Sequence, residues 1–319
     1  MKSLTLFILA LIIGYASNAQ SVDSVQLMKD VKSLTSGESG VLGNRFTGTR
    51  GSWKAQFYIT GRFGEMGLQQ LYNTYSQPFF FYYKNHKIMG TNLMGYIKGK
   101  TNNWIIISAH YDNLKGAPAY AGTDTVFVRH GDNASGVAAM LAMISWFKMH
   151  QPQHNLLFVA FDGEQEGLMG SKTFVQGSKA LLKETILNIN LDQIGSSVNN
   201  TLFACGTHQY PKLKSLVETV GDGQNISITF GHDEPGAKDN WVSQSDQRSF
   251  NDALIPFIYF GTVENGDPTG SEHIDPAFFY SAAQAILKAT INLDKYINVN
   301  LPSKNKWIMK ENSDSSLSR

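Results

Sequence analysis

The chain has 319 residues, of which 42% are apolar and 17% are charged, and its formal net charge is +1. This composition is ordinary for a globular protein, and no block of like charge indicates a nucleic-acid or membrane-binding surface. Cys205 is the only cysteine, which excludes an intramolecular disulfide. Because it lies in the strand-like segment 201–205, we expect a buried, inert thiol.

The first residues have the pattern of a secretory signal peptide. Lys2 supplies a positive charge, residues 4–16 form an apolar segment, and residues 17–19 end in Ala19, a small residue of the kind that signal peptidase reads. We therefore expect residues 1–19 to be removed and the protein to be exported, either to the periplasm or by secretion. A membrane anchor is the alternative, but the segment is short for a span of ~20 residues, so no membrane association is expected after cleavage.

The rest of the chain is expected to form a single domain over residues 20–300, followed by a polar tail at 301–319. Its hydrophobic periodicity and turn residues define the elements. In chain order they predict helices at 23–36 and 53–73, strands at 79–83, 91–98 and 103–109, a loop at 114–129, a helix at 135–150, a strand at 155–161, a helix from about 168, strands at 186–191 and 201–205, a helix at 211–219, strands at 226–230 and 256–260, and a helix at 276–296.

The alternation of strands and helices predicts the fold class. Several strands are continuous apolar runs, which are typical of parallel strands buried on both faces. Alternating strands and helices favour a sheet covered by helices on both sides. The sequence therefore predicts an α/β fold with a mixed, mostly parallel central sheet and helices on both faces.

Polar side chains follow three of these strands directly. His110 and Asp112 end the first, Glu164 lies just past the second, and Asp192 ends the third, while Asp132 precedes the helix at 135–150. Catalytic groups and ligands collect at the carboxyl ends of strands in such sheets. We therefore expect these residues to converge. Histidine and carboxylates without thiolates are typical ligands of a hard or borderline divalent ion, with zinc favoured.

His110 and Asp132 are predicted to be metal ligands, and Asp112 is predicted to orient the His110 ring. His110 alone is interpretable as a hydrogen-bonded core histidine, but Asp112 two residues later favours a metal ligand, because a ligating histidine usually gives its second N–H to a carboxylate or carbonyl. Asp112 is then the residue that orients the ring. Asp132 alone is interpretable as a helix N-cap. Since Asn133 or Ser135 can also cap that helix, we predict that Asp132 is a ligand.

The remaining two carboxylates are predicted as base and ligand. Glu164 beside a metal-bound water is a natural general base, and the alternative is an exposed acid in a turn. Asp192 is predicted to be a ligand, and the alternative is a surface carboxylate at a helix start.

Taken together, the motifs resemble the zinc-dependent exopeptidase family of bacterial leucyl aminopeptidase, glutaminyl cyclase and transferrin-receptor-like proteins. The resemblance covers about residues 23–296, and the order and spacing of the motifs are more specific than any single one. It implies a zinc aminopeptidase-like three-layer sandwich that acts on peptides. The matching segments are 109–112, 131–137, 161–171 and 190–195, with 245–247 and 256–261 as the late segments.

The resemblance also implies a ligand set. His110 and Asp192 would hold one zinc, Asp132 would bridge to a second, and Glu164 would take a proton from the bridging water. Two such ions would clamp the attacking and carbonyl oxygens.

The chain departs from that pattern at the second zinc. The family has two consecutive glutamates, base and then ligand, but here the second position is Gln165, whose amide oxygen is neutral. The family's last ligand is a histidine in a loop after the final strand. Here that loop has no histidine in the corresponding place, and His273 abuts the last helix, where the family normally has a non-ligand. Gln165 and His273 are therefore the candidates that depart from the pattern, and His232 and His130 are two other histidines that could replace the missing ligand. The sequence predicts one tight zinc rather than two.

The function predicted first is an exported zinc aminopeptidase that removes N-terminal residues from peptides by metal-activated water. A catalytically weak or inactive member of the fold that binds peptides is the second interpretation, and a glutaminyl cyclase is the third. Peptides are the expected partners in each case, and no nucleic acid is expected.

Overall fold

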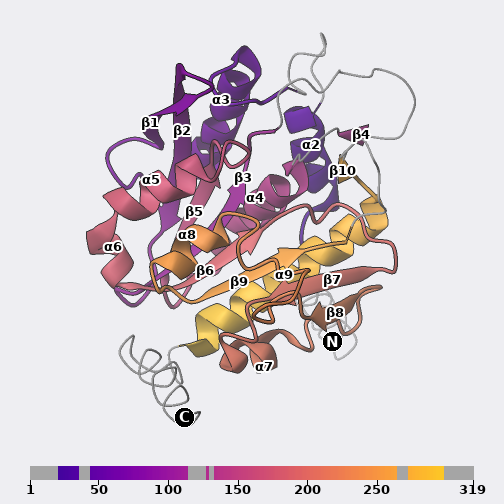
Figure 1. The fold of residues 1–319 in the computed structure, drawn as a ribbon. Helices are drawn as coiled ribbons and strands as arrows, with labels where there is room; N and C mark the ends of the chain where they lie inside the picture. Colours follow the sequence, from indigo (N-terminus) through magenta and orange to yellow (C-terminus); the bar gives the residue numbers. More distant parts are fainter. Residues whose placement is uncertain (1–20, 36–43, 114–126, 129–132, 264–271, 298–319) are drawn as a thin grey trace, which may run out of the picture.

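The computed structural model describes residues 21–35, 44–113, 127–128, 133–263 and 272–297. Within them, an eight-stranded sheet lies between two layers of helices (Figure 1). The strands of this sheet are β1 (Ser76–Tyr83), β2 (His86–Ile97), β3 (Trp104–His110), β5 (Asn155–Phe161), β6 (Thr185–Leu191), β7 (Thr201–Cys205), β8 (Ser227–Phe230) and β9 (Phe257–Gly261).

The strand order is β1-β2-β5-β3-β6-β9-β7-β8. The centre, β5-β3-β6-β9, is wholly parallel, and β8 is parallel to β7. The β1–β2 hairpin joins β5 antiparallel, and β7 joins β9 antiparallel. The predicted fold class, a mixed and mostly parallel sheet with helices on both faces, is confirmed.

The helices follow from capping and apolar spacing. The Thr49 hydroxyl accepts a hydrogen bond from the Ser52 backbone N–H at 3.3 Å and so caps the helix that begins at Arg50. The Asp275 carboxylate caps the last by accepting from Ala277 and Phe278. The helices are α2 (Ser24–Thr35), α3 (Arg50–Glu65), α4 (Ala134–Met149), α5 (Met169–Gly177), α6 (Lys179–Lys183), α7 (Lys214–Val217), α8 (Gln247–Asp252) and α9 (Pro276–Tyr296), with a short 3₁₀ turn at Pro211–Leu213.

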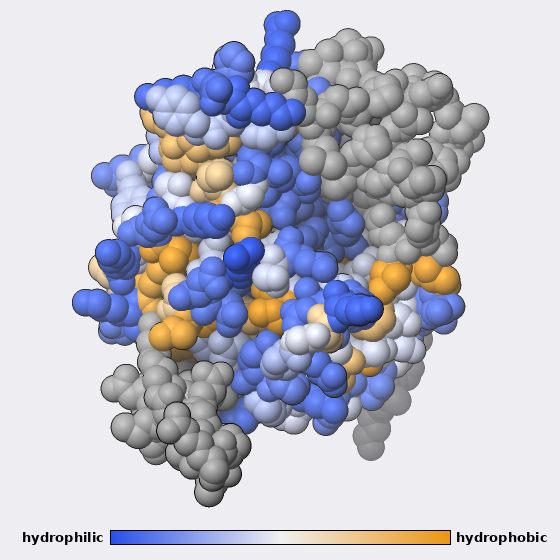
Figure 2. Space-filling view, viewed as in Figure 1, coloured by the Kyte–Doolittle hydropathy of each residue, from blue (hydrophilic) through white to orange (hydrophobic). Residues whose placement is uncertain are grey.

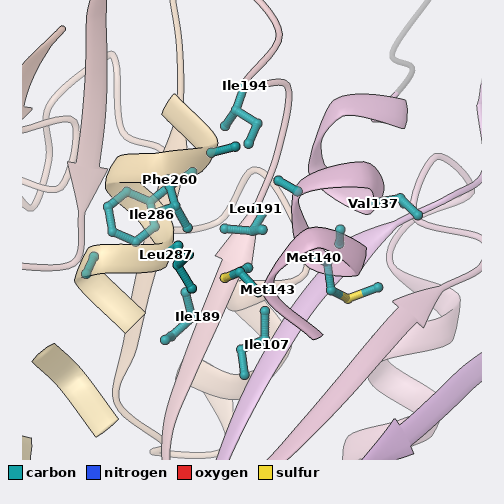
Figure 3. Packing of buried hydrophobic residues seen from close by; sticks show 14 of the residues in the cluster. Ile107, Val137, Met140, Met143, Ile189, Leu191, Ile194, Phe260, Ile286 and Leu287 are labelled. Atoms are coloured by element: carbon teal, nitrogen blue, oxygen red, sulfur yellow. The ribbon is translucent and has the colours of Figure 1, made fainter. Parts of the chain in front are cut away.

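Strand alternation divides the core into two layers. Ile105 and Ile107 of β3 belong to the larger cluster, which also holds buried residues of α2, α3, α4 and α9. Ile106, between them, belongs to the smaller cluster with Phe174 of α5 and Phe250 of α8. Figure 3 shows the larger cluster near the centre of the sheet, where Met143 of α4 lies among side chains of β3, β6 and α9.

Most predicted elements are confirmed, including the strand at 155–161 and the helix at 276–296, which match residue for residue. The predicted helix 53–73 is wrong at both ends, because Thr49 starts it earlier and Gly67, with a φ of 63°, lies in the turn that ends it. Three elements were not predicted, helix α8 and the two strands of the small antiparallel sheet, β4 (Phe127–Val128) and β10 (Glu272–His273).

The signal segment 1–19, the tail 301–319 and most of the predicted loop 114–129 lie outside the described residues. None of the helices in the described part of the chain is long and apolar enough to cross a membrane. The face shown in Figure 2 is largely hydrophilic, and its apolar residues form separate patches.

Candidate active site

The site begins with two adjacent parallel strands. In the β3–β6 register, Ser108 lies opposite Asn190, so the next outward pleat brings His110 and Asp192 together. The His110 Nε2 and Asp192 Oδ1 atoms are 3.4 Å apart, and both side chains are largely buried. Asp192 Oδ1 has no hydrogen-bond partner among the described residues. Two of the three predicted ligands therefore meet at one point, and each has an atom available there for an ion.

Asp112 holds the histidine ring and the neighbouring turn together. His110 Nδ1 lies 3.1 Å from the Asp112 carbonyl oxygen and 3.5 Å from its carboxylate. The carboxylate itself accepts hydrogen bonds from two backbone N–H groups, Glu164 to Oδ1 at 3.1 Å and Gln165 to Oδ2 at 3.0 Å. Sequence reasoning predicted the contact with the ring but not the two amide bonds, which fix the turn that carries Glu164.

Glu164 lies in a tight turn after β5. Gly163 and Gly167 have φ values of 69° and 99°, and Leu168 has 64°, a conformation that favours glycine. The Glu164 carbonyl accepts from the N–H groups of Gly167 and Leu168, which closes the turn. Glu164 Oε2 lies 4.0 Å from His110 Nε2. The turn therefore places this buried carboxylate beside the His110–Asp192 pair, where a general base was predicted.

A second acidic cluster lies behind the turn. The Thr47 hydroxyl is 2.8 Å from Asp162 Oδ1 and 2.9 Å from Glu166 Oε2. Asp162 also accepts from the Tyr111 hydroxyl and the Thr91 N–H. One hydroxyl hydrogen serves only one carboxylate, so a proton on Glu166 completes the second bond to Thr47. Glu166 thus faces Thr47, and nothing in the described structure places it at the His110–Asp192 pair.

The start of α4 was predicted to free Asp132 for a metal. Asn133 is indeed the N-cap: its Oδ1 accepts from Gly136 N at 3.1 Å and from Gln193 N at 3.0 Å. Its Nδ2 donates to the Leu191 carbonyl at 2.7 Å, so the cap also ties α4 to β6. Asp132 itself lies outside the described residues. Among the described residues, no group of three or more His, Cys, Asp or Glu side chains is arranged to hold a metal ion.

Gln165 and His273 are the two remaining candidate ligands. Gln165 is in the same turn as Glu164 and is held through its backbone N–H by Asp112. His273 is in β10, whose partner is β4 rather than any strand of the large sheet. His232, another candidate replacement, stacks on Trp241 at 3.8 Å between ring centroids and has Nδ1 2.7 Å from Asp239. His130 lies outside the described residues.

Asp246 joins the site, although sequence reasoning had not assigned it a role. It is fully buried just before α8, and neither of its carboxylate oxygens has a hydrogen-bond partner in the described part of the chain. Its charge acts on His110, Asp112 and Asp192. The available signal was the Ser-Asp pair at 245–246, which matched a late segment of the resembled family.

The electrostatics of the site are those of crowded buried acids around one imidazole. Burial lowers the pKa of His110, but the carboxylates around it, Glu164 foremost, outweigh this and raise it well above its ordinary value. Burial raises the pKa of Glu164 well above its ordinary value and that of Asp246 to about 7. A cation at this point would therefore reduce the repulsion between the buried carboxylates, which bound protons reduce when no cation is present.

Residues 92–295 match the model of Peptidase family M28, and this segment is more than half of the chain. The chain therefore belongs to Peptidase family M28.

Two curated relatives show the extent of the similarity. The alkaline phosphatase isozyme conversion protein of Escherichia coli strain K12 is 29% identical over 160 residues, 47% of this chain and 46% of that protein. Aminopeptidase YwaD of Bacillus subtilis strain 168 is 28% identical over 180 residues, 54% of this chain and 34% of that protein. The chain thus spans less than half the length of these relatives.

Solved structures support the fold. BSAP, a zinc aminopeptidase from Bacillus subtilis, superposes with a TM-score of 0.64 at 16% identity, over 85% of this chain and 95% of that one. At this identity the similarity concerns the fold alone.

Proposed function

We propose that this protein is a zinc-dependent aminopeptidase that hydrolyses the N-terminal peptide bond of peptides. The observation that carries the proposal is the 3.4 Å approach of His110 Nε2 and the unpartnered Asp192 Oδ1, with Glu164 4.0 Å from the same nitrogen. Relatives named aminopeptidase and a structural neighbour named zinc aminopeptidase support the substrate class and the metal.

The residues present fit a zinc ion. His110 has Nδ1 engaged by Asp112, which leaves Nε2 as the ligating atom. Asp192 offers a buried oxygen that no protein group satisfies. We propose Asp132, which lies outside the described residues, as the third ligand. When bound, zinc supplies charge that activates water and polarises a carbonyl.

The chain's own contribution to turnover is a placed base. Burial raises the pKa of Glu164, which makes its carboxylate a stronger proton acceptor. Asp112 fixes the Glu164 backbone by accepting its N–H, so the side chain starts from a rigid turn. We propose that Glu164 accepts the proton of the attacking water and passes it to the leaving amine.

We further propose that the protein binds one zinc tightly rather than two. Gln165 provides a neutral amide where a carboxylate would help to balance a second divalent charge. Of the candidate replacement histidines in the described residues, His273 lies in β10 and His232 stacks on Trp241. Two zinc ions per chain at stoichiometric metal would overturn the single-zinc proposal.

We also propose that the mature protein is exported, with cleavage after Ala19. Support comes from the positive Lys2, the apolar segment 4–16 and the small residues that end at Ala19. In the described structure the Val22 N–H donates to Gln284 Oε1 at 2.8 Å. Cleavage after Ala19 leaves this hydrogen bond intact. Mass spectrometry of the protein recovered from a bacterial host identifies the mature N-terminus, and a retained segment 1–19 contradicts the proposal.

The central test compares two substitutions of glutamate. In Glu164→Gln, turnover of an aminoacyl anilide should fall by ~10²–10⁴ while the zinc content is unchanged, because a positioned base is lost. Glu184→Gln, an exposed position between α6 and β6, is the matched control and should retain wild-type turnover. Equal activity of wild type and Glu164→Gln removes Glu164 from the mechanism. A zinc-loaded wild-type protein without any anilide or peptide hydrolysis favours the peptide-binding alternative.

A second experiment addresses the metal count. Gln165→Glu restores the charge of the missing carboxylate and should raise the affinity for a second zinc if a further ligand lies in reach. Titration of metal-free wild type and variant by calorimetry gives both stoichiometries. One zinc in both proteins shows that more than Gln165 separates this chain from a two-zinc site.

A further inference from the structure

A column of buried polar side chains lies directly beneath the site. Ser108 and Asn190 each precede a predicted ligand, His110 or Asp192, by two residues, and strand alternation places all four on one face of the sheet. Ser108 and Asn190 are fully or almost fully buried, and the Ser108 hydroxyl donates to Asn190 Oδ1 at 2.7 Å. The sheet layer below the ligands is therefore polar, in a place where apolar side chains would pack.

Asn190 reaches from the sheet to the segment that carries Asp246. Its amide nitrogen donates to Ser245 Oγ at 3.2 Å and to Gln247 Oε1 at 2.9 Å, the residues on either side of Asp246. The Gln247 amide nitrogen in turn donates to the Trp241 carbonyl at 2.7 Å. One buried side chain thus contacts both neighbours of a buried carboxylate that has no hydrogen-bond partner of its own in the described structure.

The orientation of the Asn190 amide is fixed by proton counting. Asn188 Nδ2 donates to Ser108 Oγ at 2.9 Å, so the Ser108 hydrogen is directed to Asn190 Oδ1. The Asn190 oxygen therefore faces Ser108, and both of its N–H groups face the segment 245–247. Every donor in this series of hydrogen bonds has an acceptor. A flipped Asn190 amide would place its N–H groups opposite the Ser108 O–H and its oxygen opposite the segment 245–247, so the arrangement is specific.

We propose that Asn190 is a positioning residue that holds the segment 245–247, and with it the Asp246 carboxylate, against the His110–Asp192 pair. The inference rests on the proposed function for its zinc-binding consequence, but the mechanical link itself is independent of it. Removing the link lets the segment move away from the sheet. The charge of Asp246 then no longer adds to the field at the ligands, and zinc binds more weakly.

Asn188 provides a matched control. It is also a buried asparagine on β6, on the same face and one pleat further from the site, and it bonds to Ser108 and to the Ile106 carbonyl. It has no hydrogen bond to the segment 245–247. Asn188→Leu and Asn190→Leu are nearly isosteric changes that remove one buried amide each. Because Asn188 Oδ1 has no hydrogen-bond partner in the described structure, whereas Asn190 is bonded through both amide atoms, Asn188→Leu should cost less stability. Only Asn190→Leu should free the segment.

The first measurement is amide hydrogen exchange in the zinc-free proteins. Asn190→Leu should raise exchange in residues 241–252 by tenfold or more, on the order expected for the loss of a local tie, whereas Asn188→Leu should leave that segment close to wild type. The second is zinc affinity by chelator competition. Asn190→Leu should weaken it about 10–100-fold, the usual effect of losing a group that supports a metal site, and Asn188→Leu by less than threefold.

Several outcomes decide the proposal. Equal exchange and equal zinc affinity in the two leucine variants would overturn it and assign Asn190 a merely structural part. If Asn190→Leu does not fold, Gln247→Met breaks the same link from the other side and should show the same two changes, and unchanged exchange there also overturns the proposal. If wild type binds no zinc, the proposed function fails, while the exchange experiment still decides whether Asn190 holds the segment.

Discussion

The Asp112 carboxylate is the position at which a single isosteric change should be most informative. Each of its oxygens serves a different backbone amide, Oδ1 that of Glu164 and Oδ2 that of Gln165, and the side chain is fully buried. In Asp112→Asn one oxygen becomes an NH₂ group that points at an N–H. One buried amide is then left without an acceptor.

The cost follows from that geometry. A buried donor that loses its acceptor costs about 1–3 kcal/mol. Removing the Asp112 charge also relieves its repulsion of Asp162, which is one cause of the raised pKa of that residue. Because this relief offsets part of the cost, we expect Asp112→Asn to lose about 1–2 kcal/mol more than a control in which both hydrogen bonds survive.

Asp233→Asn is that control. Asp233 is also buried and also accepts two backbone amides, Gly206 at 2.8 Å and His208 at 2.9 Å, but both go to the same oxygen. An asparagine oxygen can keep both. Both variants lose one carboxylate charge, so the charge-assisted part of the bonds is largely common to the two.

Urea unfolding of the zinc-free proteins at pH 7, followed by fluorescence and circular dichroism together, measures the difference, and coincident transitions justify a two-state free energy. An equal loss of stability in Asp112→Asn and Asp233→Asn would refute the reasoning. It would mean that the turn carrying Glu164 does not depend on a carboxylate with two separate acceptor oxygens.

Two further predictions concern stability. Burial raises the pKa of Glu166 from 4.5 to about 8. Between these pH values the folded protein therefore binds more protons than the unfolded one. Its stability should fall as the pH rises from 4.5 to about 8. Glu166→Gln, whose amide can still donate to Thr47, should match wild type near pH 4.5 and become steadily more stable than wild type up to about pH 8 in urea unfolding; a constant difference contradicts this. Gly136→Ala should destabilise by about 1–3 kcal/mol, because a Cβ there would lie 2.8 Å from the Leu191 carbonyl. Gly61→Ala, in an open part of α3, should instead stabilise by about 0.5–1 kcal/mol, and melting temperatures that move in the same direction in both variants would show the packing argument to be wrong.

Sequence reasoning worked where burial and periodicity act locally. The run at 156–161 is continuous and apolar, and 186–191 is apolar apart from two asparagines, because parallel strands are covered on both faces. The existence of these strands and the side of the sheet on which they end could therefore be predicted. Helix α9 was readable because Pro276 at its first turn and a long apolar stripe define it. The residues at the ends of the parallel strands were therefore predicted to be neighbours, and the 3.4 Å distance between His110 Nε2 and Asp192 Oδ1 agrees with this prediction.

The features that the sequence did not predict depend on contacts between distant segments. Helix α8 has six residues, too few for a periodic pattern, and it lies against the sheet through Phe250. The strand order that inserts β5 between β2 and β3 is a long-range property with no local signal. Asp246 was not assigned because its burial depends on tertiary contacts around Asn190, and an isolated Ser-Asp pair indicates a turn as readily as a site.

The register that brings His110 beside Asp192 also has a consequence for folding. The two residues become neighbours only when β3 and β6 pair, and β5 pairs with the other edge of β3. A partly folded chain without this pairing has no preformed pocket for an ion, so capture should follow completion of the central sheet. A ligand that binds only the native state adds RT ln(1 + [L]/Kd) to its stability, about 2.7 kcal/mol at 100 times Kd. Bound metal would then stabilise the folded protein against unfolding and would leave its folding rate unchanged.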